Sequence, residues 1–125
     1  MMPVKTITTA NMKQAVPFFG VTNTEASLRF YLDGPGFTIV RKWIPEGDEH
    51  YPSDGKIRWC WLELGEAAIM LQEFLPERKP KEKLGTGINV CFQCEDALAL
   101  YREFKSRGIK TRTARRWETA SGLCR

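Results

Sequence analysis

The sequence repeats itself with an offset of 72 residues, and this repeat restricts the possible folds more than any other feature. Each copy reads as an apolar strand, an amphipathic helix that ends at glycine, and a further strand. The offset superposes Val16 on Ile88, Leu28 on Leu100, Leu32 on Phe104, Gly36 on Gly108 and Phe37 on Ile109. A repeat of this kind indicates a duplicated supersecondary unit. The sequence therefore predicts an α+β domain built from two βαβββ modules.

The first copy opens with a predicted strand over Val16–Val21 and continues into a helix. Thr22 is the predicted N-cap of this helix, and Glu25 three residues later would complete a capping box. An apolar stripe made by Leu28, Tyr31 and Leu32 faces the sheet. Gly34-Pro35-Gly36 then ends the helix, because proline cannot continue it and glycine tolerates a left-handed exit.

Three further strands are predicted in the first copy, at Phe37–Ile44, Ile57–Leu64 and Ala67–Phe74. Between the first two, residues 45–56 form a loop by composition, with two prolines, two glycines and four acids. The strand over 57–64 alternates, so that Trp59 and Trp61 share one face.

The second copy starts with a predicted strand over Ile88–Gln93 and a helix that begins at a Glu95 or Asp96 cap and runs to Arg107. Its apolar stripe has helical spacing and consists of Ala97, Leu100, Tyr101 and Phe104. One more strand is expected from Ile109 to about Arg115, and no two further alternating strands follow it. The predicted division is therefore an N-terminal arm (1–15) and one domain (16–125), which comprises module one (16–75), a linker (76–86) and an incomplete module two (87–125).

Composition narrows the class of protein. A chain of 125 residues with 42% hydrophobic and 27% charged residues is typical of a single soluble globular domain. No apolar run is long enough to span a membrane, so no membrane partner and a cytoplasmic location are expected. The net charge of +4 comes entirely from the last sixteen residues, since residues 1–109 hold equal numbers of basic and acidic side chains. Because nucleic-acid binding needs basic charge spread over a folded face, no nucleic-acid partner is predicted.

The four cysteines are scattered along the chain, at Cys60, Cys91, Cys94 and Cys124. Three of them lie in a predicted strand or directly after one, and the Cys91-x-x-Cys94 spacing does not open a helix. We interpret them as buried thiols with no metal or disulfide role.

Residues 16–37 also carry a resemblance to a known family. The strand ending in Val21-Thr22-Asn23, the helix segment Glu25–Tyr31 and the Gly36-Phe37 exit resemble the opening of the vicinal-oxygen-chelate superfamily, which includes glyoxalase I, bleomycin-resistance proteins and extradiol dioxygenases. Residues 59–65 and 69–73 look like that family's third and fourth strands. The resemblance covers roughly Val16 to Lys110, and it implies an open, curled mixed sheet around a cleft with the helices outside.

The resemblance also implies where a divalent metal would be bound, because the family takes its ligands from the first and fourth strands of each module. These positions fall on Val16, Met70 and Ile88, and the last position has no residue in this chain. None of the three side chains is a ligand for such a cation. Glu73 is an odd number of positions from Met70 and so points to the opposite face of a regular strand, and His50 is a lone loop histidine. We therefore predict no metal, no cofactor and no catalytic residues.

Aromatic and apolar residues are the candidate ligand-binding set: Phe18, Trp43, Trp59, Trp61 and Met70. The two tryptophans of one strand face offer apolar surface and indole N–H donors that could orient a ligand. The alternative is that they belong to the core or to a dimer interface. The chain is similar to bleomycin-resistance proteins, which sequester a flat cationic drug in clefts made by dimers. This similarity implies that the acids of the loop could help to attract a cation: Glu46, Asp48, Glu49 and Asp54.

The sequence therefore predicts a homodimeric protein that binds a small aromatic or apolar ligand in a cleft without metal catalysis, or an inactive relative of such proteins. The alternatives are a metal-dependent lyase or dioxygenase of the same superfamily, inactive or incomplete in this chain, and a purely structural module. The sequence does not identify the ligand.

The C-terminal segment departs from the family pattern, in which a Gly-Asn-Gly-Leu-Trp-Val-like segment follows the strand after Ile109. Residues 117–124, back-translated with permitted codons and read from the third base, give Gly-Asn-Gly-Leu-Trp-Val-Val. This pattern predicts that the tail results from a shift of reading frame. Sequencing the coding DNA tests it, because a shifted frame should lead into an Asp-Pro-Asp-Gly-like turn and a final strand.

Overall fold

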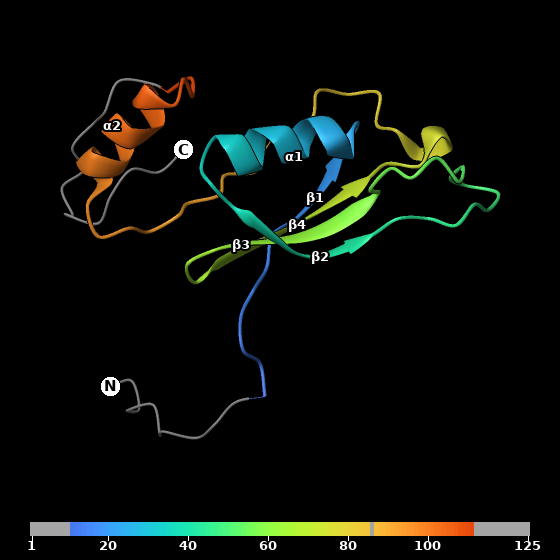
Figure 1. The fold of residues 1–125 in the computed structure, drawn as a ribbon, viewed down its shortest axis with the longest axis horizontal. Coiled ribbons are helices and arrows are strands. Elements are labelled where there is room, and N and C mark those ends of the chain that lie inside the picture. Colours follow the sequence, from blue (N-terminus) through green and yellow to red (C-terminus); the bar gives the residue numbers. More distant parts are fainter. Residues whose placement is uncertain (1–10, 86, 112–125) are drawn as a thin grey trace.

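A computed structural model describes residues 11–85 and 87–111 and confirms an α+β fold with an open mixed sheet (Figure 1). In chain order its elements are β1 (Phe18–Val21), α1 (Thr24–Asp33), β2 (Thr38–Trp43), β3 (Trp59–Leu64), β4 (Ala67–Glu73), the 3-10 helix η1 (Pro76–Arg78) and α2 (Ala97–Ser106). All four strands come from the first copy of the repeat, and the second copy contributes α2. No helix in the described part of the chain combines the length and apolar character that crossing a membrane requires.

The strand order in the sheet is β1-β4-β3-β2. β1 runs parallel to β4, whereas β3 is antiparallel to both of its neighbours. β3 and β4 form a hairpin, with Leu64 paired to Ala67 across the turn. The β2–β3 register shifts between Ile39 and Arg41, so one extra residue of β2 bulges out of the ladder.

The start of α1 differs from the prediction. Asn23, not Thr22, is the N-cap, and its side-chain oxygen accepts a hydrogen bond from the Ala26 N–H at 3.1 Å. Asparagine caps a helix as well as threonine does, so the two neighbouring residues could not be separated by type alone. Glu25 does not complete a capping box, because its carboxylate accepts the N–H of Ile57 instead, at 3.0 Å.

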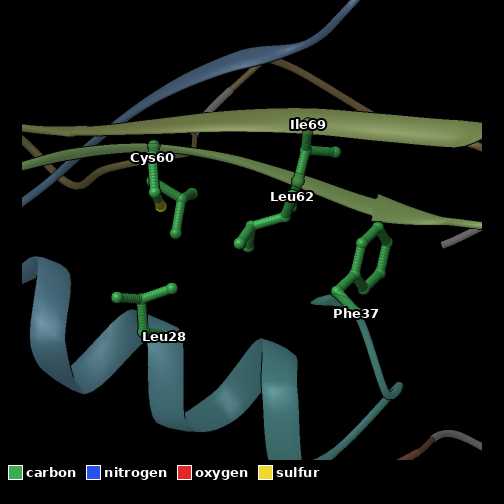
Figure 2. Close-up of a cluster of buried hydrophobic side chains, with 6 residues drawn as sticks. Leu28, Phe37, Cys60, Leu62 and Ile69 are labelled. Atoms are coloured by element: carbon green, nitrogen blue, oxygen red, sulfur yellow. The ribbon is translucent and has the colours of Figure 1, made fainter. Parts of the chain in front are cut away.

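The hydrophobic core lies between α1 and one face of the sheet (Figure 2). The helix contributes Leu28, and the sheet contributes buried side chains from β3 and β4, including Leu62 and Ile69, which have no exposed surface. Phe37, at the exit from the helix, closes one end of this core. The predicted alternation of β3 is confirmed, since its buried residues alternate with half-buried ones.

The second copy of the repeat is structured differently. Its helix is confirmed: the Asp96 side chain caps α2 by accepting the Ala99 N–H at 3.0 Å, and the predicted stripe forms its half-buried face. The predicted strand Ile88–Gln93 is wrong, because the structure has no strand there and Ile88 is 66% exposed. An apolar run becomes a strand only when a neighbouring strand satisfies its backbone groups. Residues 109–111 are not a strand either, and the rest of that prediction falls on residues outside the described part.

α2 lies beside the C-terminal end of α1 and away from the sheet (Figure 1). The Arg107 guanidinium joins the two helices, because it donates to the carbonyl oxygens of Gly34 at 2.9 Å and Pro35 at 3.1 Å. An edge-to-face contact between Phe37 and Phe92, with ring centroids 6.1 Å apart, adds an apolar link.

The cysteines also differ between the two copies, because among the described residues only the first copy has a sheet that buries them. Cys60 in β3 is a buried free thiol, as predicted, and burial raises its pKa to about 11. Cys94 is free and half-buried. Cys91 corrects the prediction, because it is exposed and disulfide-bonded. It lies in the segment that does not form a strand, so no sheet buries it. Cys124 lies outside the described residues.

Candidate functional site

All five residues predicted to bind a ligand lie on the face of the sheet opposite α1, which we call the helix-free face. Phe18 pairs with Met70 and Met70 pairs with Trp61, so these three form one row across three strands. Trp59 pairs with Trp43 in a neighbouring row. Cross-strand partners share a face, and the residues that alternate with them on β3 and β4 are the buried ones under α1. Pairing of four strands thus gathers residues that are up to 52 positions apart in the chain.

No described residue fully covers these five side chains, so they remain accessible to solvent in the described part of the chain. Phe18 is 55% exposed and Trp43 is 40% exposed, whereas Trp59, Trp61 and Met70 are half-buried. They are therefore not part of the core in the described part of the chain. Half-buried aromatic side chains keep a fixed orientation while presenting apolar surface, as a binding face requires.

Trp61 has polar contacts that the sequence did not predict. Its indole N–H donates to the Glu63 carboxylate at 2.7 Å, so this donor is already used within the protein. The Arg41 guanidinium lies over the ring, with its central carbon 4.8 Å from the ring centroid. The period-two pattern of β3 already indicated that Glu63 shares the face of Trp61, but the Arg41 contact depends on the β2–β3 register.

Trp43 is held by a loop residue that sequence reasoning missed. The Tyr51 ring packs edge-to-face against Trp43, with centroids 5.7 Å apart. Tyr51 is buried, and this burial raises the pKa of its phenol. Its hydroxyl donates to the backbone carbonyl of Glu73 at 2.6 Å. A tyrosine in a loop rich in acids, prolines and glycines gives no sequence signal that it is buried.

Three of the four loop acids are already engaged within the protein. Asp48 accepts the backbone N–H groups of Tyr51 and His50 at 2.8 and 2.7 Å, and these bonds lower the pKa of Asp48. The Lys56 N–H, and then the charge of Arg58, lower the pKa of Asp54. His50 lies 3.3 Å from the carboxylate of its neighbour Glu49, and it also contacts the 3-10 helix. Only Glu46 lacks such a contact among the described residues.

Glu73 points to the α1 side of the sheet, as predicted from its odd spacing from Met70. One carboxylate oxygen accepts the Thr24 N–H at 3.0 Å, and the other forms an ion pair with Arg58. Arg58 also pairs with Asp54 at 2.7 Å. Both members of the Glu73–Arg58 pair are largely buried, at 14% and 11% side-chain exposure. Glu73 therefore anchors β4 to the start of α1 and to the loop.

The positions that correspond to the family's metal ligands do not fit a metal. Val16 and Ile88 carry hydrocarbon side chains, and Met70 carries a thioether, which is a poor donor for a hard or borderline cation. Glu73 is committed to Arg58 and to the helix start. Within residues 11–85 and 87–111 there is no group of three or more His, Cys, Asp or Glu side chains that could hold a metal ion.

Comparisons with known proteins agree with this architecture. The sequence model of the Glyoxalase/Bleomycin resistance protein/Dioxygenase superfamily matches residues 11–122. Among solved structures, the chain is similar to the crystal structure of a bleomycin resistance determinant encoded on the transposon Tn5. That similarity has a TM-score of 0.55 and 22% sequence identity, and covers 82% of this chain and 71% of the other. No match was found among curated proteins.

Proposed function

Because this chain belongs to the glyoxalase/bleomycin resistance protein/dioxygenase superfamily, we propose that its helix-free face binds a small aromatic or apolar molecule without metal catalysis. The observation that carries this proposal is the row of Phe18, Met70 and Trp61 beside Trp59 and Trp43, accessible on one face. Burial of a flat ring against these side chains would remove apolar surface from water on both partners. The similar structure of a bleomycin resistance determinant supports a binding role over a catalytic one.

The chemistry of the ligand positions supports the metal-free part of the proposal. A superfamily enzyme that uses a divalent cation needs carboxylate, imidazole or amide donors, and this chain has Val16, Met70 and Ile88 at the corresponding places. Metal analysis of the purified protein tests this part. Stoichiometric metal that is lost in Glu73→Ala would favour the metal-dependent lyase or dioxygenase and overturn our proposal.

Tryptophan fluorescence tests the binding face directly. The protein is titrated with a panel of planar aromatic drugs, and the affinity of the best compound is compared in Trp59→Ala, Trp61→Ala and a control, Phe30→Ala. Phe30 is an exposed aromatic residue on α1, away from the helix-free face. We expect each tryptophan variant to weaken binding about tenfold or more, and the control to bind as wild type does.

Two results would count against the binding face. If both tryptophan variants lose their circular dichroism signal and unfold, these side chains are structural and the core interpretation holds. If both stay folded and bind as tightly as wild type, the ligand lies elsewhere.

We also propose a homodimer in which residues 16–75 act as module one and residues 87–125 as a partial module two. Both edge strands, β1 and β2, lack a second neighbour in the described sheet, and the helix-free face has no covering layer there. Pairing of an edge strand with a second copy would satisfy the open backbone groups of that strand. Light scattering at micromolar concentration tests the assembly, and a monomer mass would overturn it.

A further inference from the structure

We infer that the helix-free face selects planar aromatic ligands that carry a negatively charged oxygen group, and that Arg41 is the residue that selects them. This inference rests on the proposed function, because it concerns the same face. It adds a ligand class that the apolar row alone does not define, and it opposes the expectation of a cationic ligand.

Arg41 is held in place by its contact with Trp61. The two residues are direct partners in the β2–β3 ladder, and the guanidinium carbon lies 4.8 Å from the centre of the indole ring. A guanidinium held against an aromatic ring is attracted by the negative face of the ring, and its N–H groups can still donate hydrogen bonds. Ordering of this long side chain by Trp61 lowers the entropy cost of binding an anion.

The charge of Arg41 is not neutralised by any described residue. Arg58 pairs with Asp54 and Glu73, and Arg107 pairs with Glu103, whereas Arg41 forms no ion pair within the described part of the chain. A cation on a binding face without an acidic partner has its N–H donors available for a carboxylate, sulfonate or phosphate.

The acids near the face are engaged in contacts within the protein. Glu63 is on the same face, and its carboxylate accepts the Trp61 N–H but keeps its negative charge, which opposes anion binding and is removed in the Glu63→Gln test below. Of the four loop acids that could have attracted a cationic drug, Asp48, Glu49 and Asp54 contact groups of their own loop or Arg58. The described face therefore presents an apolar row, one cation without an ion-pair partner, Arg41, and one carboxylate that already accepts a hydrogen bond, Glu63.

The size of the ligand follows from the spacing of the strands. Neighbouring strands are about 4.8 Å apart, so the row from Phe18 through Met70 to Trp61 extends over roughly 10 Å. The Arg41 guanidinium lies over Trp61, at one end of this row. A two-ring aromatic acid has the length of the row, with its rings over Phe18 and Met70 and its carboxylate at the guanidinium.

Three naphthalene derivatives that share the ring system and carry an anionic, a neutral or a cationic group test the inference by isothermal titration calorimetry at low salt: 2-naphthoate, 2-naphthamide and protonated 2-naphthylmethylamine. Wild type, Arg41→Gln and Lys42→Gln are compared. Lys42 is the matched control, because it is the neighbouring exposed cation on β2 but pairs with Cys60 and so belongs to the α1 side. We expect the naphthoate to bind about tenfold tighter than the amide in wild type and in Lys42→Gln, and no tighter than the amide in Arg41→Gln.

Glu63→Gln gives a second, opposite test, since the glutamine can still accept the Trp61 N–H. Removal of this negative charge should strengthen naphthoate binding about twofold and leave amide binding unchanged. If the amide binds but the naphthoate is no tighter, or if the cation binds best, the inference is wrong and the proposed function stands. If none of the three compounds binds at millimolar concentration, the inference is wrong, and the drug panel decides the proposed function separately.

Discussion

The two helices of this protein have the same length and similar sequence patterns, but their surroundings differ. α1 and α2 each have ten residues, an Asn or Asp N-cap and a glycine shortly after the last turn. α1 buries Thr24 and Leu28 against the sheet, whereas α2 has no fully buried residue and contacts the end of α1. The comparison shows that capping and an apolar stripe determine that a helix forms, while its degree of burial depends on the strands available to cover it.

The strongest test of this difference compares the two ion pairs. We expect Glu73→Gln to lower the free energy of unfolding by about 3 kcal/mol, because it removes one of the two carboxylates that pair with the buried Arg58 and leaves only Asp54. Glu103→Gln removes a more exposed i,i+4 partner of Arg107, with 48% and 37% side-chain exposure, and should cost about 0.5 kcal/mol. Urea denaturation measures both, and equal costs would contradict the distinction between the two regions.

A second pair compares leucines that the repeat places at equivalent positions. Leu28 is 4% exposed in the core, and Leu100 is half-buried on α2. Leu28→Ala should cost about 3 kcal/mol of unfolding free energy, and Leu100→Ala about 1 kcal/mol or less. The same urea titrations check this. A cost for Leu100→Ala as large as that for Leu28→Ala would mean that α2 is packed as well as α1.

The reactivity of the Cys60 and Cys94 thiols compares the two copies of the repeat without a mutation in the core. The raised pKa of Cys60, about 11, leaves little thiolate at pH 8, and its side chain has no exposed surface. We expect Cys94 to react with a thiol reagent at least about a hundredfold faster, and the rate at Cys60 to rise as the pH approaches 11. Peptide-resolved mass spectrometry follows each site, with Cys94→Ser as the control. Fast labelling of Cys60 at pH 8 would show that the sheet opens readily.

The smallest effect concerns two glycines at equivalent positions of the repeat, each two or three residues after the last helical residue. Gly36 and Gly108 both have positive φ, 96° and 78°, which L side chains rarely adopt. We expect Gly36→Ala and Gly108→Ala each to cost about 1 kcal/mol in urea denaturation. A cost at Gly36 without one at Gly108 would show that α2 unfolds separately from the sheet.

The outcomes for individual residues show how far sequence reasoning reaches. The faces of β3 and the stripe of α2 were predicted correctly because they depend on the local period of the chain. The predicted N-cap of α1, Thr22, differs by one residue from the observed N-cap, Asn23, because both residue types are suitable caps. The strand at Ile88–Gln93 was wrong because a strand also needs a partner, which no local pattern can supply.

By itself, the sequence determined the family, the repeat, the helices, the strands of the first copy and the absence of suitable donors at Val16, Met70 and Ile88. These features depend on residue type and on spacing along the chain. Only the tertiary structure decided how distant residues meet. It paired Glu73 with the start of α1, 49 residues away, and placed Arg41 over Trp61. Such contacts are set by strand register and helix position, because a shift of one residue moves a side chain to the other face of the sheet.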